Sequence, residues 1–124
     1  MRIVIILLSA LLVASCETAG GEVTSDTLAA IASGALVIDV RTPAEFNEGH
    51  FPGAINIPHE KVIEGLRHRG TKPDRAVVVY CHSGNRSGKA EAMLVTGGFS
   101  RVKNAGGLEA LLAATGTKQV LPAP

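Results

Sequence analysis

The chain has 124 residues, which is enough for one ordinary domain and too few for two. Hydrophobic residues make up 46% and charged residues 19%, so the chain is too apolar for a disordered protein and too charged for a bundle of membrane spans. A formal net charge of +1 and only 3% aromatic residues argue against a nucleic-acid partner, which calls for a basic surface. Two cysteines do not make a disulfide framework.

The first residues of the chain read as a secretion signal. One positive charge, Arg2, precedes an apolar run over residues 3–14 in which Ser9 is the only polar residue. At about 1.5 Å per residue the run spans roughly 18 Å, well short of a hydrocarbon core of about 30 Å. This pattern predicts a signal peptide over residues 1–15, with a buried N-terminal helix as the alternative.

A cysteine follows the apolar run directly. The segment Val13-Ala14-Ser15-Cys16 resembles the lipobox of bacterial lipoproteins. This resemblance implies that Cys16 is lipid-modified, becomes the first residue of the mature chain and anchors it on the periplasmic side of a bacterial membrane. Glu17, in place of Asp, leans towards the outer membrane. A plain secretory cleavage that leaves Cys16 as a free thiol is the alternative.

The remaining chain divides into a polar tether at 16–22, a domain at 23–115 and a C-terminal tail at 116–124, which contains two prolines and is expected to be loose. The domain alternates between helix-like and strand-like segments. In chain order we expect a helix at 26–33 capped by Ser25, a strand at 36–40, a helix begun by Thr42-Pro43-Ala44-Glu45, a strand at 54–57, a helix at 59–69, a strand at 76–80, a helix at 87–96, a strand around Val102 and a helix at 108–114. This order predicts an α/β domain with a mainly parallel sheet.

A cysteine stands at the carboxyl end of the most strand-like segment, where ligands bind in parallel sheets. Cys81 follows residues 76–80 and opens the loop Cys81-His82-Ser83-Gly84-Asn85-Arg86-Ser87. Converging loop N–H groups, the start of a helix and the charge of Arg86 all favour a thiolate. We therefore predict that Cys81 is a nucleophile. The alternative is a buried structural cysteine, although a loop of Gly, Asn and Arg does not have the composition of a core.

We expect structural rather than catalytic roles for His50 and for two charged residues, Arg41 and Glu45. His50 lies in a tight turn at 49–53 and is expected to bond to backbone. His59, His68 and His82 lack the spacing of a metal site, so we expect neither a metal nor a cofactor. Arg41 and Glu45 are expected to pair across one helical turn at the surface.

Three segments together resemble the rhodanese family. Residues 39–58, which run from Asp39-Val40-Arg41 to Ile57-Pro58, look like the family's signature. Residues 81–87 are similar to its active-site loop, and residues 102–108, with Gly106-Gly107, to its closing segment. The resemblance covers nearly all of 23–115. It implies a rhodanese-like domain in which a five-stranded, mainly parallel sheet has helices on both faces.

The resemblance also implies a reaction and a site. A small anionic donor such as thiosulfate would pass its outer sulfur to Cys81, and the resulting persulfide would pass it to cyanide or a thiol. The loop amides would cradle that sulfur, and Arg86 would either bind the donor or shape the loop by pairing with a carboxylate. Asp39 and Arg41 would support the loop from a neighbouring strand. The loop residues implied are His82, Ser83, Gly84, Asn85, Arg86 and Ser87.

Two other functions remain open. A persulfide carrier would serve a partner protein rather than turn over small molecules. Phosphatases and arsenate reductases with related folds carry a loop with five residues between cysteine and arginine, whereas four separate Cys81 from Arg86. His82-Ser83 also replaces the basic pair of the best-known thiosulfate enzymes of the rhodanese family, so the preferred donor is open.

Overall fold

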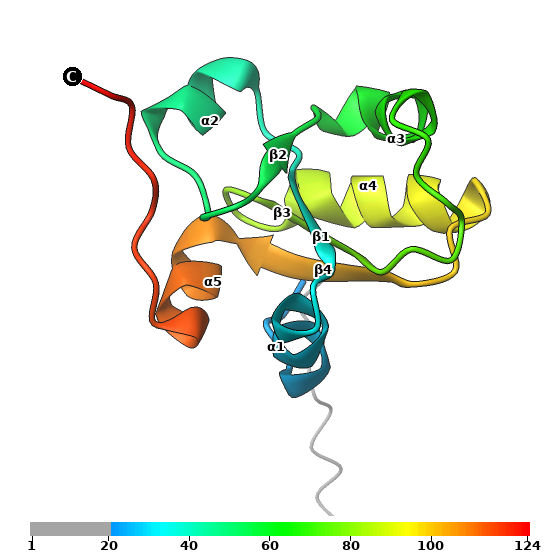
Figure 1. The fold of residues 1–124 in the computed structure, drawn as a ribbon, viewed down its shortest axis with the longest axis horizontal. Coiled ribbons are helices and arrows are strands. Elements are labelled where there is room, and N and C mark those ends of the chain that lie inside the picture. Colours follow the sequence, from blue (N-terminus) through cyan, green and yellow to red (C-terminus); the bar gives the residue numbers. More distant parts are fainter. Residues whose placement is uncertain (1–20) are drawn as a thin grey trace, which may run out of the picture.

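The computed structural model describes residues 21–124. The predicted signal peptide, Cys16 and most of the tether therefore lie outside the described residues. No helix within 21–124 is long and apolar enough to cross a membrane. The elements are α1 (Ser25–Ala32), β1 (Leu36–Asp39), α2 (Pro43–Glu48), β2 (Ile55–Asn56), the 3-10 turn η1 (His59–Lys61), α3 (Val62–His68), β3 (Val77–Cys81), α4 (Asn85–Thr96), β4 (Val102–Gly107) and α5 (Leu108–Thr115) (Figure 1).

The strands form one parallel sheet in the order β2-β1-β3-β4. β3 lies between β1 and β4 and is buried along its whole length. The predicted α/β class is confirmed. The strand count differs from the expected five: within residues 21–124 the sheet has four strands, and residues 21–24 ahead of α1 form none.

Alternate side chains of the central strands serve two hydrophobic cores, one on each face of the sheet. Ile38 and Val79 face α3 and α4, whereas Val37 and Val78 face α1 and α5. In the view of Figure 1, α3 and α4 lie above the sheet and α1 lies below it. The expectation of helices on both faces is confirmed. The helical residues of the two cores are Val62, Leu66, Ala90 and Leu94 on one face, and Ala30, Ile31, Leu108 and Leu111 on the other.

Capping residues set where the helices begin. Thr42 and Glu45 close a capping box at the start of α2, as predicted: the Thr42 hydroxyl accepts from the Glu45 N–H at 3.2 Å, and the Glu45 carboxylate accepts from the Thr42 N–H at 3.3 Å. The cap of α1 is Thr24 rather than Ser25. α4 begins at Asn85, two residues earlier than predicted, because Gly84 makes the turn with a φ of +94°.

The C-terminal tail is pinned at one point. The Val120 N–H donates to the His50 carbonyl at 2.8 Å and the His50 N–H to the Val120 carbonyl at 3.1 Å, an antiparallel bridge. Figure 1 shows the tail running from α5 back to α2. The expectation of a loose tail therefore fails at Val120. The ring of His50 stacks on Phe46 and its Nδ1 lies 3.0 Å from the Phe46 carbonyl, which confirms the predicted bond from His50 to backbone.

Candidate active site

Cys81 is the last residue of β3, and its side chain is fully buried. The backbone N–H of Gly84 donates to Sγ at 2.9 Å, and the hydroxyl oxygen of Ser87 lies 3.4 Å from Sγ. Ser87 is itself fully buried in the first turn of α4, with its hydroxyl 3.5 Å from the Gly106 carbonyl oxygen. The sulfur therefore sits between the loop that follows β3 and the start of α4.

These contacts favour the thiolate. Burial raises the pKa of the Cys81 thiol, since it penalises the charged form. Hydrogen bonds from the Ser87 hydroxyl and from the backbone N–H groups of Ser87, Gly84 and Ser83 act the other way and outweigh it, so the pKa lies below its ordinary value. The N-terminus of α4 adds a partial positive charge. The site thus holds a nucleophile that is charged at a lower pH than a free cysteine.

Ser87→Ala tests this account of the thiolate. Without the hydroxyl bond the pKa of Cys81 rises, and alkylation of Cys81 by iodoacetamide at pH 7, followed on the Cys81 peptide of the full chain, is expected to slow about 10-fold. The expected pH profile of the reaction moves to higher pH. Ser83→Ala is the matched control, because Ser83 contributes through its backbone N–H and its side chain is exposed. Equal slowing in both variants, or none in Ser87→Ala, contradicts the assignment.

The remaining loop residues form the rim of the site. The side chains of His82, Ser83 and Asn85 are exposed, whereas Gly84 is buried in a left-handed conformation that favours glycine. A Cβ at Gly107 would collide with the carbonyl oxygen of His82, so the loop rests directly on the end of β4. This close approach gives Gly107 of the closing segment a physical role.

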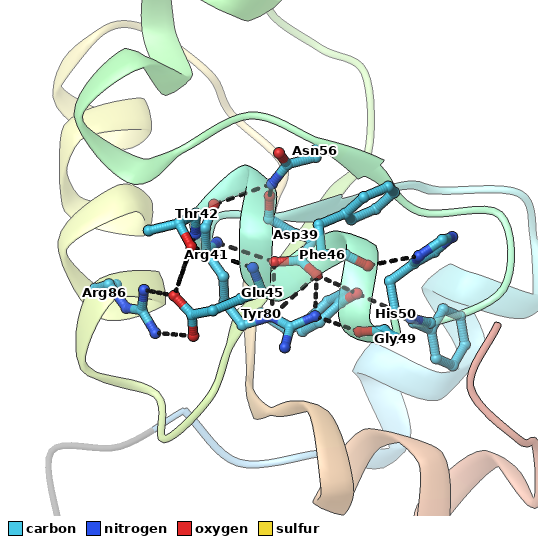
Figure 2. Close-up of polar contacts among 11 residues, drawn as sticks. Asp39, Arg41, Thr42, Glu45, Phe46, Gly49, His50, Asn56, Tyr80 and Arg86 are labelled. Atoms are coloured by element: carbon cyan, nitrogen blue, oxygen red, sulfur yellow. Dashed lines mark hydrogen bonds and ion pairs between the residues drawn. The ribbon is translucent and has the colours of Figure 1, made fainter. Parts of the chain in front are cut away.

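Arg86 forms a bidentate ion pair with Glu45 of α2 (Figure 2). The distances are 2.6 Å from Nη1 to Oε1 and 2.9 Å from Nη2 to Oε2. The Arg86 guanidinium lowers the pKa of the Glu45 carboxyl to about 2. The stability that this pair contributes is therefore present above the ordinary pKa of the carboxyl and is lost as the pH falls towards 2. Of the two roles expected for Arg86, pairing with a carboxylate is the one found here.

Asp39 and Arg41 form a second, buried pair beside the loop (Figure 2). The Arg41 Nη2 donates to Asp39 at 2.6 Å and to the Gly49 carbonyl at 2.7 Å. The expected surface pair of Arg41 with Glu45 is therefore wrong. Arg41 lies ahead of the helix that holds Glu45, so the one-turn spacing does not apply, and Arg41 folds back onto Asp39 instead.

Tyr80 is a site residue that the sequence analysis missed. Its hydroxyl donates to Asp39 at 2.8 Å and accepts from the Phe51 N–H at 2.9 Å, and burial raises its pKa. Tyr80 is the chain's only tyrosine and directly precedes Cys81 in a fully buried strand. A buried phenol needs a hydrogen-bond partner, so a tyrosine in a buried strand predicts a polar side chain close to its hydroxyl.

The histidines outside the turn at 49–53 were considered as metal ligands in the sequence analysis. His59 pairs with Glu60 at 3.1 Å at a partly exposed position. Within residues 21–124, no group of three or more His, Cys, Asp or Glu side chains could hold a metal ion.

Fold and site together define a class of protein: a parallel α/β domain whose cysteine nucleophile stands at the carboxyl end of a central strand, inside a loop of converging N–H donors. Within that class the chain belongs to the rhodanese family, since the family model described as "Rhodanese-like domain" matches residues 24–114.

Named relatives agree with this membership. The thiosulfate sulfurtransferase PspE of Escherichia coli is 42% identical over 72 residues, which cover 58% of this chain and 69% of PspE. GlpE, a thiosulfate sulfurtransferase of Pseudomonas entomophila, is 39% identical over 75 residues, covering 60% of this chain and 67% of GlpE. These names support the expectation of a rhodanese-like sulfurtransferase.

Solved structures agree on the fold. A structure titled "rhodanese with anions from E. coli" matches with a TM-score of 0.64 at 35% identity and covers 71% of this chain and 99% of that one. The human single-domain sulfurtransferase TSTD1 matches with a TM-score of 0.63 at 24% identity, covering 71% and 90%. The second likeness concerns the fold alone.

Proposed function

We propose that the protein moves a sulfane sulfur from a donor such as thiosulfate to cyanide or a thiol, through a persulfide on Cys81. The observation that carries the proposal is the buried Sγ of Cys81 with the Gly84 N–H at 2.9 Å and the Ser87 hydroxyl at 3.4 Å. The donor is taken from the named relatives, which are thiosulfate sulfurtransferases.

The first half-reaction loads the cysteine. The Cys81 thiolate attacks the outer sulfur of thiosulfate, a new S–S bond forms, and sulfite leaves with the electron pair of the old one. The outer sulfur then carries the negative charge. We expect the loop N–H groups and the start of α4 to stabilise that charge.

The second half-reaction unloads it. Cyanide or a thiolate attacks the outer sulfur, and the Cys81 thiolate leaves in its original state. The donor's leaving group departs before the acceptor reacts, so the kinetics are of the ping-pong type. The alternative of oxyanion hydrolysis calls for a loop arginine that is free to hold the oxyanion. The bidentate pair of Arg86 with Glu45 disfavours it.

The test follows the sulfur. The full chain is mixed with thiosulfate, its intact mass is recorded, cyanide is added and thiocyanate is measured. A gain of one sulfur, mapped to the Cys81 peptide and followed by steady turnover, supports the proposed function. A mass gain without turnover points to a carrier that awaits a partner protein. With neither signal the proposal fails, and an aryl phosphate is the next substrate to assay.

We propose further that Cys16 is lipid-anchored on the periplasmic side of a bacterial membrane. The support is the short apolar run over residues 3–14, which Ser15-Cys16 follows directly. Membrane fractions of cells that express the full chain are expected to yield a mature protein that begins at a lipid-modified Cys16. In Cys16→Ser this modified N-terminal peptide is expected to be absent. An unmodified mature N-terminus in the wild-type protein overturns the proposal.

A further inference from the structure

Two guanidinium groups beside the active-site loop are already paired with carboxylates. The loop supplies one cationic side chain, Arg86, and both of its terminal nitrogens are bonded to Glu45. The neighbouring guanidinium, that of Arg41, is bonded to Asp39. Lys89, the next cation along α4, lines a hollow between α4 and β4. A donor that approaches Cys81 therefore meets backbone N–H groups and guanidinium charges that carboxylates have neutralised.

This arrangement matters because sulfane donors differ in charge. Thiosulfate carries two negative charges, so its complex with the Cys81 thiolate brings three together. A thiosulfonate anion brings two, and an uncharged hydropersulfide of a thiol brings one. Each added negative charge needs a positive partner to offset repulsion, and near a protein surface two unit charges a few ångströms apart interact by several kcal/mol. A site whose guanidinium is neutralised discriminates against the most highly charged donor.

We propose that Glu45 is a specificity-determining residue: by neutralising Arg86 it biases the site towards sulfane donors with one negative charge or none, over dianionic thiosulfate. The inference rests on the proposed sulfur transfer. With a hydropersulfide, the Cys81 thiolate attacks the outer sulfur, the donor's S–S bond breaks and its inner sulfur leaves as a thiolate. The outer sulfur keeps its proton and forms the new S–S bond to Cys81.

A substitution at Glu45 can separate its charge from its role in capping α2. Glu45 has two tasks, since its carboxylate also accepts from the N–H and the hydroxyl of Thr42 in the capping box. Gln also occupies this position of a capping box, so Glu45→Gln is expected to remove the charge and keep the hydrogen-bond acceptor at the start of α2. Glu48 ends the same helix, is exposed and belongs to none of the ion pairs of residues 21–124. Glu48→Gln is therefore the matched control for loss of one negative charge on α2.

The experiment compares two donors that differ in charge. The full chain and its Glu45→Gln and Glu48→Gln variants are assayed at low ionic strength with thiosulfate and with benzenethiosulfonate, a monoanion, at fixed cyanide. In Glu45→Gln the KM for thiosulfate is expected to fall about 10-fold, and that for benzenethiosulfonate about threefold. In Glu48→Gln both KM values are expected to stay within twofold. Added salt is expected to shrink the Glu45→Gln effect.

Two results overturn the inference. One is an equal change in KM for both donors, which would mean that the Arg86–Glu45 ion pair only holds the loop in shape. The other is a rise in the KM for thiosulfate, which means that Arg86 needs Glu45 in order to bind it. Failure of the proposed function is seen separately, as absence of a Cys81 persulfide in the wild-type protein with either donor.

Discussion

Cys81→Ser is expected to remove sulfur transfer, with a loss of turnover of at least about 10³-fold. Serine nearly matches cysteine in size, so the fully buried site keeps its packing. The serine hydroxyl can still accept from the Gly84 N–H. At neutral pH it is not ionised, however, and its oxygen cannot form the persulfide that carries the transferred sulfur. The measurements are thiocyanate production and the intact mass after thiosulfate treatment, both on the full chain.

The control for Cys81→Ser is the melting temperature, which is expected to stay within a few degrees of the wild-type value. The only other cysteine of the chain is Cys16. If the variant still gains one sulfur, or still produces thiocyanate at a wild-type rate, the nucleophile is not Cys81. A variant that melts far below the wild-type protein tests stability rather than chemistry, and Cys81→Ala then takes its place.

The features predicted well from the sequence are local ones. The run of valines before Cys81 is the most strand-like segment of the chain, and β3 is that strand. Thr42 and Glu45 are three residues apart, which is the spacing of a capping box, and both of its bonds are present. The position of Cys81 then follows from the rule for parallel sheets. These features depend on neighbours within a few residues.

The features that were missed join distant residues. Arg86 and Glu45 are separated by 41 residues, as are Tyr80 and Asp39. A pairing of this kind depends on the strand order, which places the ends of β1 and β3 side by side. The spacing of Arg41 and Glu45 misled for the same reason, because it assumes one continuous helix and α2 begins only at Pro43. The tail bridge between Val120 and His50 has no local pattern at all.

Asp39→Ala is expected to lower the free energy of unfolding by about 3–5 kcal/mol. The Asp39 side chain is fully buried and accepts hydrogen bonds from the Arg41 guanidinium, the Arg41 N–H and the Tyr80 hydroxyl. Alanine leaves a buried guanidinium without its carboxylate and a buried phenol without its acceptor. For a domain of about 100 residues, a loss of this size lowers the melting temperature by at least about 10 °C. Thermal unfolding followed by circular dichroism measures it.

Asp74→Ala is the matched control, because Asp74 is exposed and belongs to none of the ion pairs of residues 21–124. Its expected effect on the free energy of unfolding is within about 0.5 kcal/mol. The network also bears on the nucleophile, since Tyr80 adjoins Cys81 and anchors the Phe51 N–H to the end of β1. If Asp39→Ala unfolds like Asp74→Ala, Arg41 and Tyr80 find other partners and the pair does not stabilise the active-site end of the sheet.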